Sequence, residues 1–425
     1  MPRLIVNGKR KLGGNIPVTG AKNSVLPLLA ATLLTDGETV LHNCPRLSDV
    51  DTSLKILNGL GCKTKFEGDT ATVDASSVNC SVISDALMRE MRSSIVFLGA
   101  IASRCGCAKL SAPGGCELGP RPIDIHIDSL RKMGLQITEQ NGYLNCVLTD
   151  GRFHGTDITL NFPSVGATEN IILAAVLCDG TVTARNCARE PEIEDLCDFL
   201  AKCGARIKGA GTPTITIEGV RSLHSTEHTV IPDRIVASTY FSAAAATGNR
   251  LCVDNVIKEH LLPCIPAFEE MGCKFRFCGS SVMIIPPERP LKVEKINTMV
   301  YPGFPTDACP PFMASACVAE GTSMFIENIF ENRYKFVDEL KRLGAKIKVV
   351  GKVAVIEGTP TLFGAKTRAT DLRGGAALVV AALSAEGKTE IDMAGFIDRG
   401  YEHIEAALSG IGADIKRIPD KIIKF

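Results

Sequence analysis

The sequence has no excess of charge of either sign. Its 47 lysines and arginines are balanced by 47 aspartates and glutamates, so the formal net charge is zero. A neutral chain produces no overall field that attracts nucleic acid or an anionic membrane. We therefore expect no nucleic-acid partner, and any anion-binding site must be local.

Long apolar runs are also missing. No run reaches the roughly 18 residues needed to span a bilayer. The N-terminal MPRLIVNGKRKLGGN lacks the apolar stretch of a signal peptide. These absences predict a cytoplasmic protein with no membrane span.

Common metal and nucleotide motifs are absent as well. The 17 cysteines include no CxxC pair, and neither GxxxxGK[ST] nor HExxH occurs. Cys105 and Cys107 could contact a metal, but thiols scattered along a long chain are more often buried as small apolar groups. We expect reduced thiols and no metal site.

Glycine recurs at regular intervals and reveals an internal repeat of about 70 residues. Each repeat has an apolar helix, a glycine turn, a strand, a polar loop, an amphipathic helix ending in glycine, and one or two further strands. Glycine suits a helix end because it enters the left-handed region without a Cβ penalty. The helix-ending glycines are Gly61, Gly134, Gly204, Gly272, Gly344 and Gly412, and the turn glycines are Gly37, Gly106, Gly180, Gly248, Gly321 and Gly387.

The two helices of each repeat differ in character. The first is almost entirely apolar, which predicts burial on every side, whereas the second is amphipathic and should face water. Six α/β units in 425 residues predict two domains of three units each. We place the hinge near GVRSLHSTEHTVIPDR, with domains at residues 21–229 and at residues 1–20 plus 230–425, and expect the leading strand RLIVNG to complete the second domain.

The second repeat contains an insertion. Its two glycines, Gly106 and Gly134, are 28 residues apart, whereas the spacing in the other repeats is 23 to 25. The surplus lies in SAPGGCELGPRP, and a loop that interrupts a regular scaffold usually carries function. Cys116 in this loop could be a buried small hydrophobe, but its flanking glycines and Arg121 favour a reactive thiolate, as nucleophile or proton donor.

Charged residues recur at the helix junctions. A cation at a helix N-terminus opposes the macrodipole, so its repetition suggests a bound anion. The second helix of each repeat is preceded by a base: Arg46, Arg121, Arg189, Lys258, Arg333 and Arg399. The first helix begins beside Lys22, Arg92, Gly166, Arg234, Asp307 and Arg373.

Ordinary surface salt bridges are the alternative explanation for these cations. We favour it where an acid is adjacent: Arg46 with Asp49, Arg189 with Glu190 and Glu192, and Lys258 with Glu259. Lys22, Arg121, Arg373 and Arg399 lie among small residues, which favours an anion site. Asp307, after a Pro/Gly turn, could be a general base or a helix N-cap.

In these segments the sequence resembles the enolpyruvyl transferases, and in particular the branch that acts on a UDP-sugar. The similarity covers essentially the whole chain. It is carried, in the family's order, by GAKNSVLPLLAATLL, MRSSI, PGGCELGPRPIDIHI, FPSVGATENI, REPEIEDL, IPDRI, YPGFPTD, IFENR, TDLRGGAALV and IDRGYEHIE.

The resemblance implies a two-domain inside-out α/β barrel of six repeated units that closes around its substrates. It implies transfer of enolpyruvyl from phosphoenolpyruvate to the 3-hydroxyl of UDP-N-acetylglucosamine, with release of phosphate, in peptidoglycan synthesis. Cys116 would donate a proton to the vinyl carbon and would be alkylated by the epoxide antibiotic fosfomycin. No cofactor and no metal are implied, and we expect a monomer.

The resemblance also assigns site residues. Asp307 would accept the proton of the sugar hydroxyl. Phosphoenolpyruvate would contact Lys22, Asn23, Arg121, Arg373 and Arg399. The UDP-sugar would be lined by Arg92, Arg121, Pro122, Ile123, Asp124, Ile125, Ser164, Val165, Gly166, Asp307 and Ile329.

The chain departs from the family pattern at three places. Phe162 stands where some members carry lysine, so Ser164 and nearby amides would replace a side-chain contact to the diphosphate. Cys309, Pro310 and Pro311 open the helix after Asp307, which a first turn tolerates. Gly374 and Gly375 stand where alanine is common, and we expect a looser turn around Arg373.

Three rival functions remain open. A shikimate-pathway enolpyruvyl transferase would share the repeat but lack the cysteine loop. A non-catalytic paralogue that binds nucleotide sugar and regulates would have no need of Lys22, Cys116, Asp307, Arg373 and Arg399. An RNA end-processing protein would require a basic surface with interleaved aromatics, which the sequence lacks.

Overall fold

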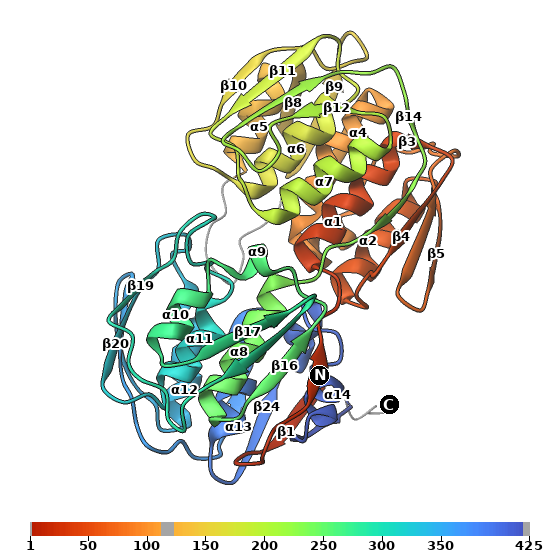
Figure 1. The fold of residues 1–425 in the computed structure, drawn as a ribbon. Coiled ribbons are helices and arrows are strands. Elements are labelled where there is room, and N and C mark those ends of the chain that lie inside the picture. Colours follow the sequence, from red (N-terminus) through yellow and green to blue (C-terminus); the bar gives the residue numbers. More distant parts are fainter. Residues whose placement is uncertain (1, 112–122, 420–425) are drawn as a thin grey trace. The chain divides into compact units, whose positions relative to one another are not determined.

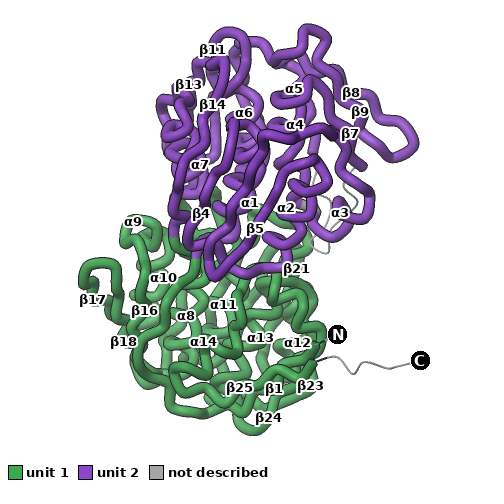
Figure 2. The backbone as a smooth tube through the Cα atoms, turned by 90° about the vertical axis from the view of Figure 1, so that its right-hand side faces the viewer, with its two compact units in different colours: residues 1–19, 117–119, 232–425 green, residues 20–116, 120–231 purple. Residues whose placement is uncertain are grey.

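The computed structural model describes residues 2–111 and 123–419, which fall into two compact units (Figure 1). The described part of unit 1 comprises residues 2–19 and 232–419, and that of unit 2 comprises residues 20–111 and 123–231 (Figure 2). Each unit has its own hydrophobic core and is described by itself.

Unit 2 contains the first three repeats. Its buried helices are α1 (Lys22–Ala31), α4 (Phe97–Cys105) and α6 (Val165–Ala175), and its outer helices are α2 (Ser48–Gly59), α5 (Asp124–Lys132) and α7 (Pro191–Lys202). Shorter elements are η1 (Thr32–Leu34), α3 (Asp85–Glu90) and η2 (Arg92–Val96).

The sheets of unit 2 lie outside these helices and share one strand pattern. The first has the order β15 (Glu227–Thr229), β4 (Glu38–His42), β6 (Thr70–Asp74), β5 (Lys63–Glu67). The third has the order β10 (Asp157–Thr159), β11 (Thr181–Arg185), β13 (Thr214–Glu218), β12 (Arg206–Lys208). In both, the first pair of strands is parallel and the others are antiparallel. β3 (Thr35–Asp36) and β14 (Leu223–His224) form a small extra ribbon.

The second repeat departs from this pattern. In the described part of the chain its sheet has three strands, β7 (Cys107–Ser111), β9 (Tyr143–Leu148) and β8 (Leu135–Gln140). A single parallel bridge between Val82 and Lys109 stands where the other sheets have a fourth strand. β7 leads directly into residues 112–122.

Unit 1 contains repeats four to six. Its buried helices are α8 (Arg234–Thr247), α11 (Cys309–Ala316) and α13 (Leu372–Ser384). Its outer elements are α9 (Lys258–Leu261), α10 (Ile265–Glu270), η3 (Arg333–Phe336), α12 (Val337–Arg342), η4 (Ala394–Arg399) and α14 (Ile404–Gly410).

The sheets of unit 1 repeat the same strand pattern. The fourth has the order β2 (Asn15–Pro17), β16 (Leu251–Asp254), β18 (Ser281–Ile285), β17 (Lys274–Cys278), and the fifth has the order β19 (Lys295–Asn297), β20 (Thr322–Ile326), β22 (Val353–Glu357), β21 (Lys346–Val350). The sixth has the order β23 (Lys366–Arg368), β24 (Lys388–Asp392), β1 (Arg3–Asn7), β25 (Asp414–Ile418).

The N-terminal strand completes the last sheet, as the sequence predicts. β1 lies between β24 and β25 and is antiparallel to both. Its apolar residues Leu4 and Val6 are fully buried and face the core. Strands from the two ends of the chain therefore close one sheet.

The repeat glycines adopt the conformation for which the sequence argument selected them. All twelve have positive φ, from +67° at Gly248 to +102° at Gly412. Side chains with a Cβ disfavour this region, so glycine is the economical choice at each of these helix ends and turns. The predicted period and its physical reason are both confirmed.

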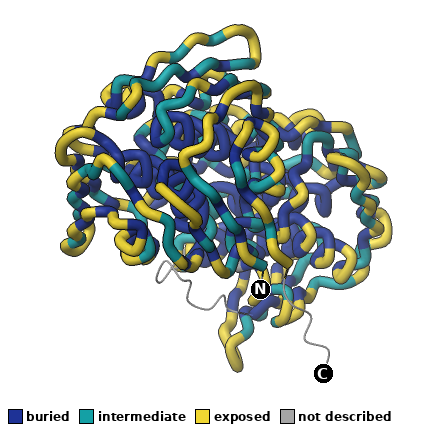
Figure 3. The backbone as a smooth tube through the Cα atoms, turned by 90° about the horizontal axis from the view of Figure 1, so that it is seen from below, coloured by how far each residue is buried: buried dark blue, intermediate teal, exposed yellow. Residues whose placement is uncertain are grey.

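The predicted burial of the first helix in each repeat is also confirmed. In α8, for example, every residue from Arg234 to Ala246 is buried, and α13 is buried from Arg373 to Ser384. Figure 3 colours the backbone by burial, with buried segments in dark blue and exposed segments in yellow. The amphipathic helices α2, α5 and α7 bury one face and expose the other. Among the described residues, no helix combines the length and apolar character needed to cross a membrane.

Candidate functional site

The described candidate residues of unit 1 gather around the first turns of α11 and α13. Asp307 lies two residues before α11. The N-cap residue of this helix is Ala308, whose side chain makes no capping hydrogen bond. The carboxylate of Asp307 instead accepts from Arg333 Nη2 at 2.9 Å and from Arg373 Nε at 3.2 Å. The N-cap alternative for Asp307 is therefore wrong.

Burial sharpens the contrast between these three charged groups. The side chains of Arg333 and Arg373 are each 2% exposed, whereas that of Asp307 is 27% exposed. Two buried guanidinium groups thus hold one partly accessible carboxylate in a fixed position. Such a preorganised charge arrangement suits proton or anion chemistry.

The buried guanidinium group of Arg373 has more hydrogen-bond donors than its protein contacts satisfy. Within the described residues, its Nη1 and Nη2 make no hydrogen bond of good geometry, although the Tyr401 hydroxyl interacts with the guanidinium. Its guanidinium carbon lies 5.2 Å from the ring centre of Tyr401. A buried donor without a partner is costly, and such a group is a reason to look for an anionic ligand.

The turn that holds Arg373 is tightly built. Asp371 caps α13 by accepting from the backbone amides of Arg373 at 3.0 Å and Gly374 at 2.9 Å. A Cβ on Gly374 would lie 2.7 Å from Asp371, and one on Gly375 would lie 2.7 Å from Ile397. The two glycines permit close packing here, so the expected loosening of this turn is wrong.

Arg399 is brought to the same end of α13. It is half-buried at the end of η4, and Gly400 follows it. A Cβ on Gly400 would lie 2.8 Å from Leu372, the first residue of α13. The close approach of these two segments, with Tyr401 against Arg373, positions the end of η4 beside the first turn of α13.

Ile329 lies in a turn organised by Glu327, a residue that the sequence argument did not select. Glu327 is fully buried and accepts from the amides of Ile329 at 2.8 Å and Phe330 at 3.0 Å. Its other oxygen accepts from Thr306 at 2.9 Å. Glu327 thereby ties the Ile329 turn to the residue preceding Asp307.

In unit 2, Lys22 occupies the first position of α1, and Asn23 follows it. Lys22 Nζ lies 3.0 Å from the carboxylate of Asp49, whose side chain is 2% exposed. Arg46 donates instead to the Gly68 carbonyl at 3.1 Å and stacks on Phe66. The predicted pairing of Arg46 with Asp49 is therefore wrong.

The expected surface pair of Lys258 is also wrong. Its ammonium lies over the ring of Phe277, 5.2 Å from the ring centre, and not beside Glu259. An aromatic face attracts a cation as a nearby carboxylate does, and sequence adjacency does not decide between them.

The second group of candidate residues in unit 2 surrounds the start of α6. Ser164 caps this helix by accepting from the amide of Ala167 at 3.3 Å, and Val165 and Gly166 form the first turn. A Cβ on Gly166 would lie 3.0 Å from the ring of His126. The N-terminus of this eleven-residue helix is suited to an anionic group.

His126 and Asn170 form a buried pair behind this turn. Asn170 Nδ2 donates to His126 Nδ1 at 2.9 Å and to the Ile95 carbonyl at 3.0 Å, and Asn170 Oδ1 accepts from the Gly99 amide at 2.7 Å. Burial lowers the pKa of His126 to about 4. The imidazole is therefore neutral near pH 7. His126 belongs to α5, whose start contains Asp124 and Ile125 and follows Ile123.

The comparisons with known proteins agree on one family. Residues 6–408 match the sequence model of the family described as EPSP synthase (3-phosphoshikimate 1-carboxyvinyltransferase). The UDP-N-acetylglucosamine 1-carboxyvinyltransferase 2 of Caldanaerobacter subterraneus subsp. tengcongensis is 53% identical over 98% of this chain and 100% of that protein. The chain belongs to the enolpyruvyl transferase family.

Further relatives support the same assignment. The UDP-N-acetylglucosamine 1-carboxyvinyltransferase 1 of Symbiobacterium thermophilum is 48% identical, over 98% of this chain and 95% of that protein. The crystal structure of the enolpyruvyl transferase NikO from Streptomyces tendae has a TM-score of 0.89 at 27% identity and covers 98% of this chain and 99% of that one. An EPSP synthase structure from Acinetobacter baumannii has a TM-score of 0.76 at 17% identity, with 99% and 100% coverage, and shows the shared fold.

Part of this enolpyruvyl transferase's predicted site lies outside the described residues. Cys116, Arg121 and Pro122 fall in residues 112–122. Arg92 begins η2, and its side chain is likewise outside what the structure describes. The roles of these residues stay predictions.

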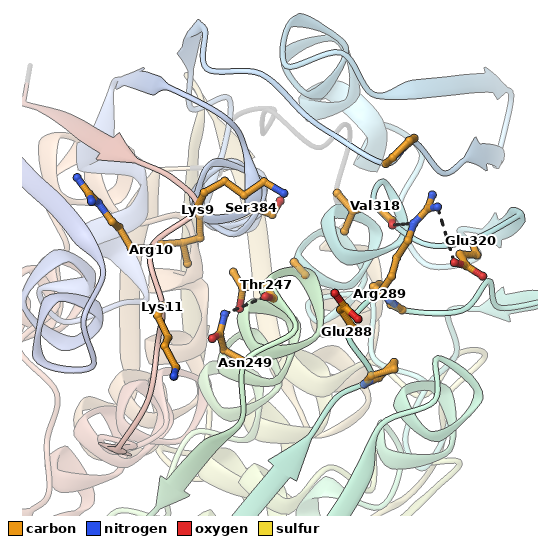
Figure 4. A pocket seen from close by; sticks show the side chains of 15 residues that line it. Lys9, Arg10, Lys11, Thr247, Asn249, Glu288, Arg289, Val318, Glu320 and Ser384 are labelled. Carbon is orange, nitrogen blue, oxygen red and sulfur yellow. Dashed lines mark hydrogen bonds and ion pairs between the residues drawn. The ribbon is translucent and has the colours of Figure 1, made fainter.

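A cavity of about 780 Å³ in unit 1, whose lining side chains Figure 4 shows, has none of the candidate residues in its lining. It lies at the C-terminal ends of α8, α11 and α13, at Thr247, Val318 and Ser384, whereas Arg373 lies at the start of α13. Arg289 in its wall donates to the Val318 and Ala319 carbonyls, both at 2.9 Å. Arg289 thus satisfies carbonyls just beyond the end of α11, and Arg10 pairs with Asp414 at 3.4 Å, so neither cation needs a ligand to explain it.

The cysteines of the described chain are free, and burial raises the pKa of many of them, for example Cys197 to about 12. Cys105 and Cys107 are half-buried. Among the described residues, no group of three or more metal-ligating side chains is placed to hold a metal ion.

Proposed function

We propose that this enolpyruvyl transferase moves the enolpyruvyl group of phosphoenolpyruvate to the 3-hydroxyl of UDP-N-acetylglucosamine and releases phosphate, in peptidoglycan synthesis. The proposal is supported by relatives of that name at 43–53% identity over nearly the whole chain. The observation that carries it at the site is the buried Arg373, two of whose guanidinium nitrogens make no hydrogen bond of good geometry among the described residues, beside the fixed carboxylate of Asp307.

Phosphoenolpyruvate has both a phosphate and a carboxylate, so several fixed cations are required to bind it. We assign Lys22, Arg121, Arg373 and Arg399 to this task, with Asn23 as a neutral donor. Arg373 suits this task because a guanidinium group can donate two parallel hydrogen bonds, which match the geometry of both a phosphate and a carboxylate. Lys22 is paired with Asp49, and it can exchange this partner for the substrate.

The chemistry we propose is addition followed by elimination. Asp307 accepts the proton of the sugar 3-hydroxyl, the oxygen forms a bond to C2 of phosphoenolpyruvate, and Cys116 donates a proton to C3. The tetrahedral intermediate then loses a proton from C3 and expels phosphate, which restores the double bond. Contact with two buried guanidinium groups favours the ionised form of Asp307, in which it can act as a base.

The UDP-sugar is assigned to the residues around α6 and α5, with Asp307 and Ile329 at the sugar. The capped N-terminus of α6 supplies amides that can receive a phosphate oxygen. The proposed lining residues are Arg92, Arg121, Pro122, Ile123, Asp124, Ile125, Ser164, Val165 and Gly166. Domain boundaries at residues 21–229 and at 1–20 plus 230–425, a monomeric state and a cytoplasmic location stay predictions.

The test of this mechanism is a pair of substitutions at Cys116. Cys116→Asp keeps a proton donor but removes the nucleophilic thiol, so we expect retained turnover with resistance to fosfomycin. Cys116→Ser should be nearly inactive, because a hydroxyl is a poor acid near neutral pH. Loss of all activity in Cys116→Asp at every pH tested would show that the thiol has a role that a carboxyl cannot perform.

The rival acceptor is shikimate 3-phosphate, the substrate named in the description of the matching family. Supplying it in place of UDP-N-acetylglucosamine distinguishes the two functions. We expect no phosphate release with it, because the relatives of highest identity reported above carry the name of the UDP-sugar enzyme.

A further inference from the structure

The first turn of α1, which presents Lys22 and Asn23, lacks the usual helix cap. The N-cap position of α1 is Ala21, which has no side-chain hydrogen bond. The buried helices α6, α8 and α13 have Ser164, Asp233 and Asp371 at their N-cap positions, each of which caps its helix, whereas α11, like α1, has no side-chain cap. A lysine at a helix N-terminus opposes the helix dipole, so this turn needs another source of stabilisation.

A buried carboxylate on the neighbouring helix supplies it. Asp195, on α7, has a 4% exposed side chain, and its Oδ2 accepts a short hydrogen bond from Ser24 Oγ. The same oxygen accepts from the Ile231 amide at 3.4 Å, and the Ile231 carbonyl accepts from the Ala21 amide at 2.7 Å. Asp195 therefore anchors both the third residue of α1 and the segment that pairs with its start.

His228, on β15, holds the other oxygen of Asp195. Its Nε2 lies 2.8 Å from Asp195 Oδ1, and its side chain is 4% exposed. Its Nδ1 lies 3.1 Å from Lys202 Nζ. Because an ammonium group only donates, Nδ1 accepts and Nε2 carries the proton that is donated to Asp195. The imidazole thus links a cation near the surface to the buried carboxylate.

The location of this chain of contacts suggests a role beyond stability. Burying a charge costs desolvation free energy, and replacing such a group by an apolar one often leaves protein stability unchanged or raises it. Stability alone therefore does not explain why a carboxylate lies at this place. Here the charge lies under the turn that carries two proposed substrate contacts, where its negative sign also offsets the helix dipole and Lys22.

We infer that Asp195 and His228 are positioning residues which, through Ser24, fix the first turn of α1 so that Lys22 and Asn23 face phosphoenolpyruvate. This inference rests on the proposed function, because it takes phosphoenolpyruvate as the ligand of Lys22 and Asn23. The pair does not touch substrate. It acts only through the position of α1.

The experiment uses the full chain and measures KM separately for phosphoenolpyruvate and UDP-N-acetylglucosamine, together with the thermal midpoint. Ser24→Ala removes one hydrogen bond to a charged group, so we expect KM for phosphoenolpyruvate to rise about tenfold. Asp195→Asn should raise it further. In both variants KM for UDP-N-acetylglucosamine should stay within about twofold of wild type.

Conservative and control variants separate positioning from general stability. Ser24→Thr retains the hydroxyl, and His228→Gln retains an N–H donor, so both should recover much of the effect that Ser24→Ala and His228→Phe cause. The control is Asp150→Ala, which removes an exposed pair with His154 in the same unit (3.0 Å) and should change neither KM. A lower thermal midpoint with both KM values unchanged would overturn the inference.

Hydrogen exchange gives a readout that does not depend on turnover. Ser24→Ala should speed amide exchange in a peptide covering residues 21–31, and Ser24→Thr should not. If wild type releases no phosphate, the proposed function fails, and this exchange measurement still decides whether the anchor exists. Unchanged exchange in Ser24→Ala would overturn the inference even if wild type is active.

Discussion

At the scale of single residues, Asp307 is the group on which the proposed chemistry depends most. Asp307→Asn removes the base and turns an amide N–H toward a guanidinium donor, so we expect kcat to fall by roughly 10²- to 10⁴-fold. Steady-state kinetics provide the measurement. Asp338→Asn, at an exposed carboxylate paired with Lys341, is the matched control and should leave kcat unchanged. A fall in kcat of less than tenfold in Asp307→Asn would contradict the role of base.

Glu169, on α6, should make stability depend on pH. Burial, with Glu192 and Glu190 nearby, raises its pKa to about 8 from the ordinary 4.5. Between these values the unfolded chain has lost the proton and the folded chain has kept it. Stability therefore falls as pH rises from about 4.5 to 8, by up to roughly 1.4 kcal/mol per pH unit.

Glu169→Gln removes this dependence. We expect its thermal midpoint to exceed that of wild type at pH 8 and to match it near pH 4.5, measured by circular dichroism. Glu139→Gln, at an exposed strand position, should show no such divergence. A constant difference between Glu169→Gln and wild type across this pH range would show that the carboxyl of Glu169 is not protonated by the fold.

Single residues also mark the limit of prediction from sequence. The sequence identifies Lys22, Asp307 and Arg373 as candidates, because their types and positions recur at helix starts. It does not identify their partners. Asp49 pairs with Lys22 and not with its neighbour Arg46, and Glu327 ties together two loops, because tertiary packing selects partners that lie far apart in sequence.

At the scale of elements, the glycine period has a direct thermodynamic test. Gly344 has φ +91°, and an added Cβ would meet only Phe363 at an ordinary 3.6 Å, so Gly344→Ala isolates the backbone strain. We expect destabilisation of about 1–2 kcal/mol. Gly410→Ala, in the last position of α14 with open space around it, should be neutral or slightly stabilising. If Gly344→Ala and Gly410→Ala changed the free energy of unfolding equally in denaturant titrations, the left-handed backbone at Gly344 would not be what requires glycine there.

The elements themselves were largely predictable. Helix ends, buried helices and the return of the first strand all follow from glycine spacing and apolar pattern, which are local signals. The three-stranded form of the second sheet could not be predicted. Val82 and Lys109 form only one parallel bridge there, and no local sequence pattern reveals that a fourth strand fails to pair.

At the scale of the whole molecule, unit 1 requires both ends of the chain. Val6 is fully buried in β1, between β24 and β25. Val6→Asp places a carboxylate in that core and should cost about 4 kcal/mol or more. Hydrogen exchange should show lost protection in unit 1 with unit 2 unchanged.

Ile5→Thr tests the opposite face of the same strand. Ile5 is half-buried, so this change should cost less than about 1.5 kcal/mol and leave exchange in both units near wild type. If Val6→Asp were as mild as Ile5→Thr, β1 would be dispensable for unit 1. The closure of the last sheet would then contribute little.

The central claim is tested most directly by measuring phosphate release from phosphoenolpyruvate with and without UDP-N-acetylglucosamine, before and after treatment with fosfomycin. We predict release only when the sugar nucleotide is present, and its loss on alkylation. Release without the sugar nucleotide, or no release while an active relative works alongside, would contradict the proposed function and leave the buried guanidinium of Arg373 to a different anion.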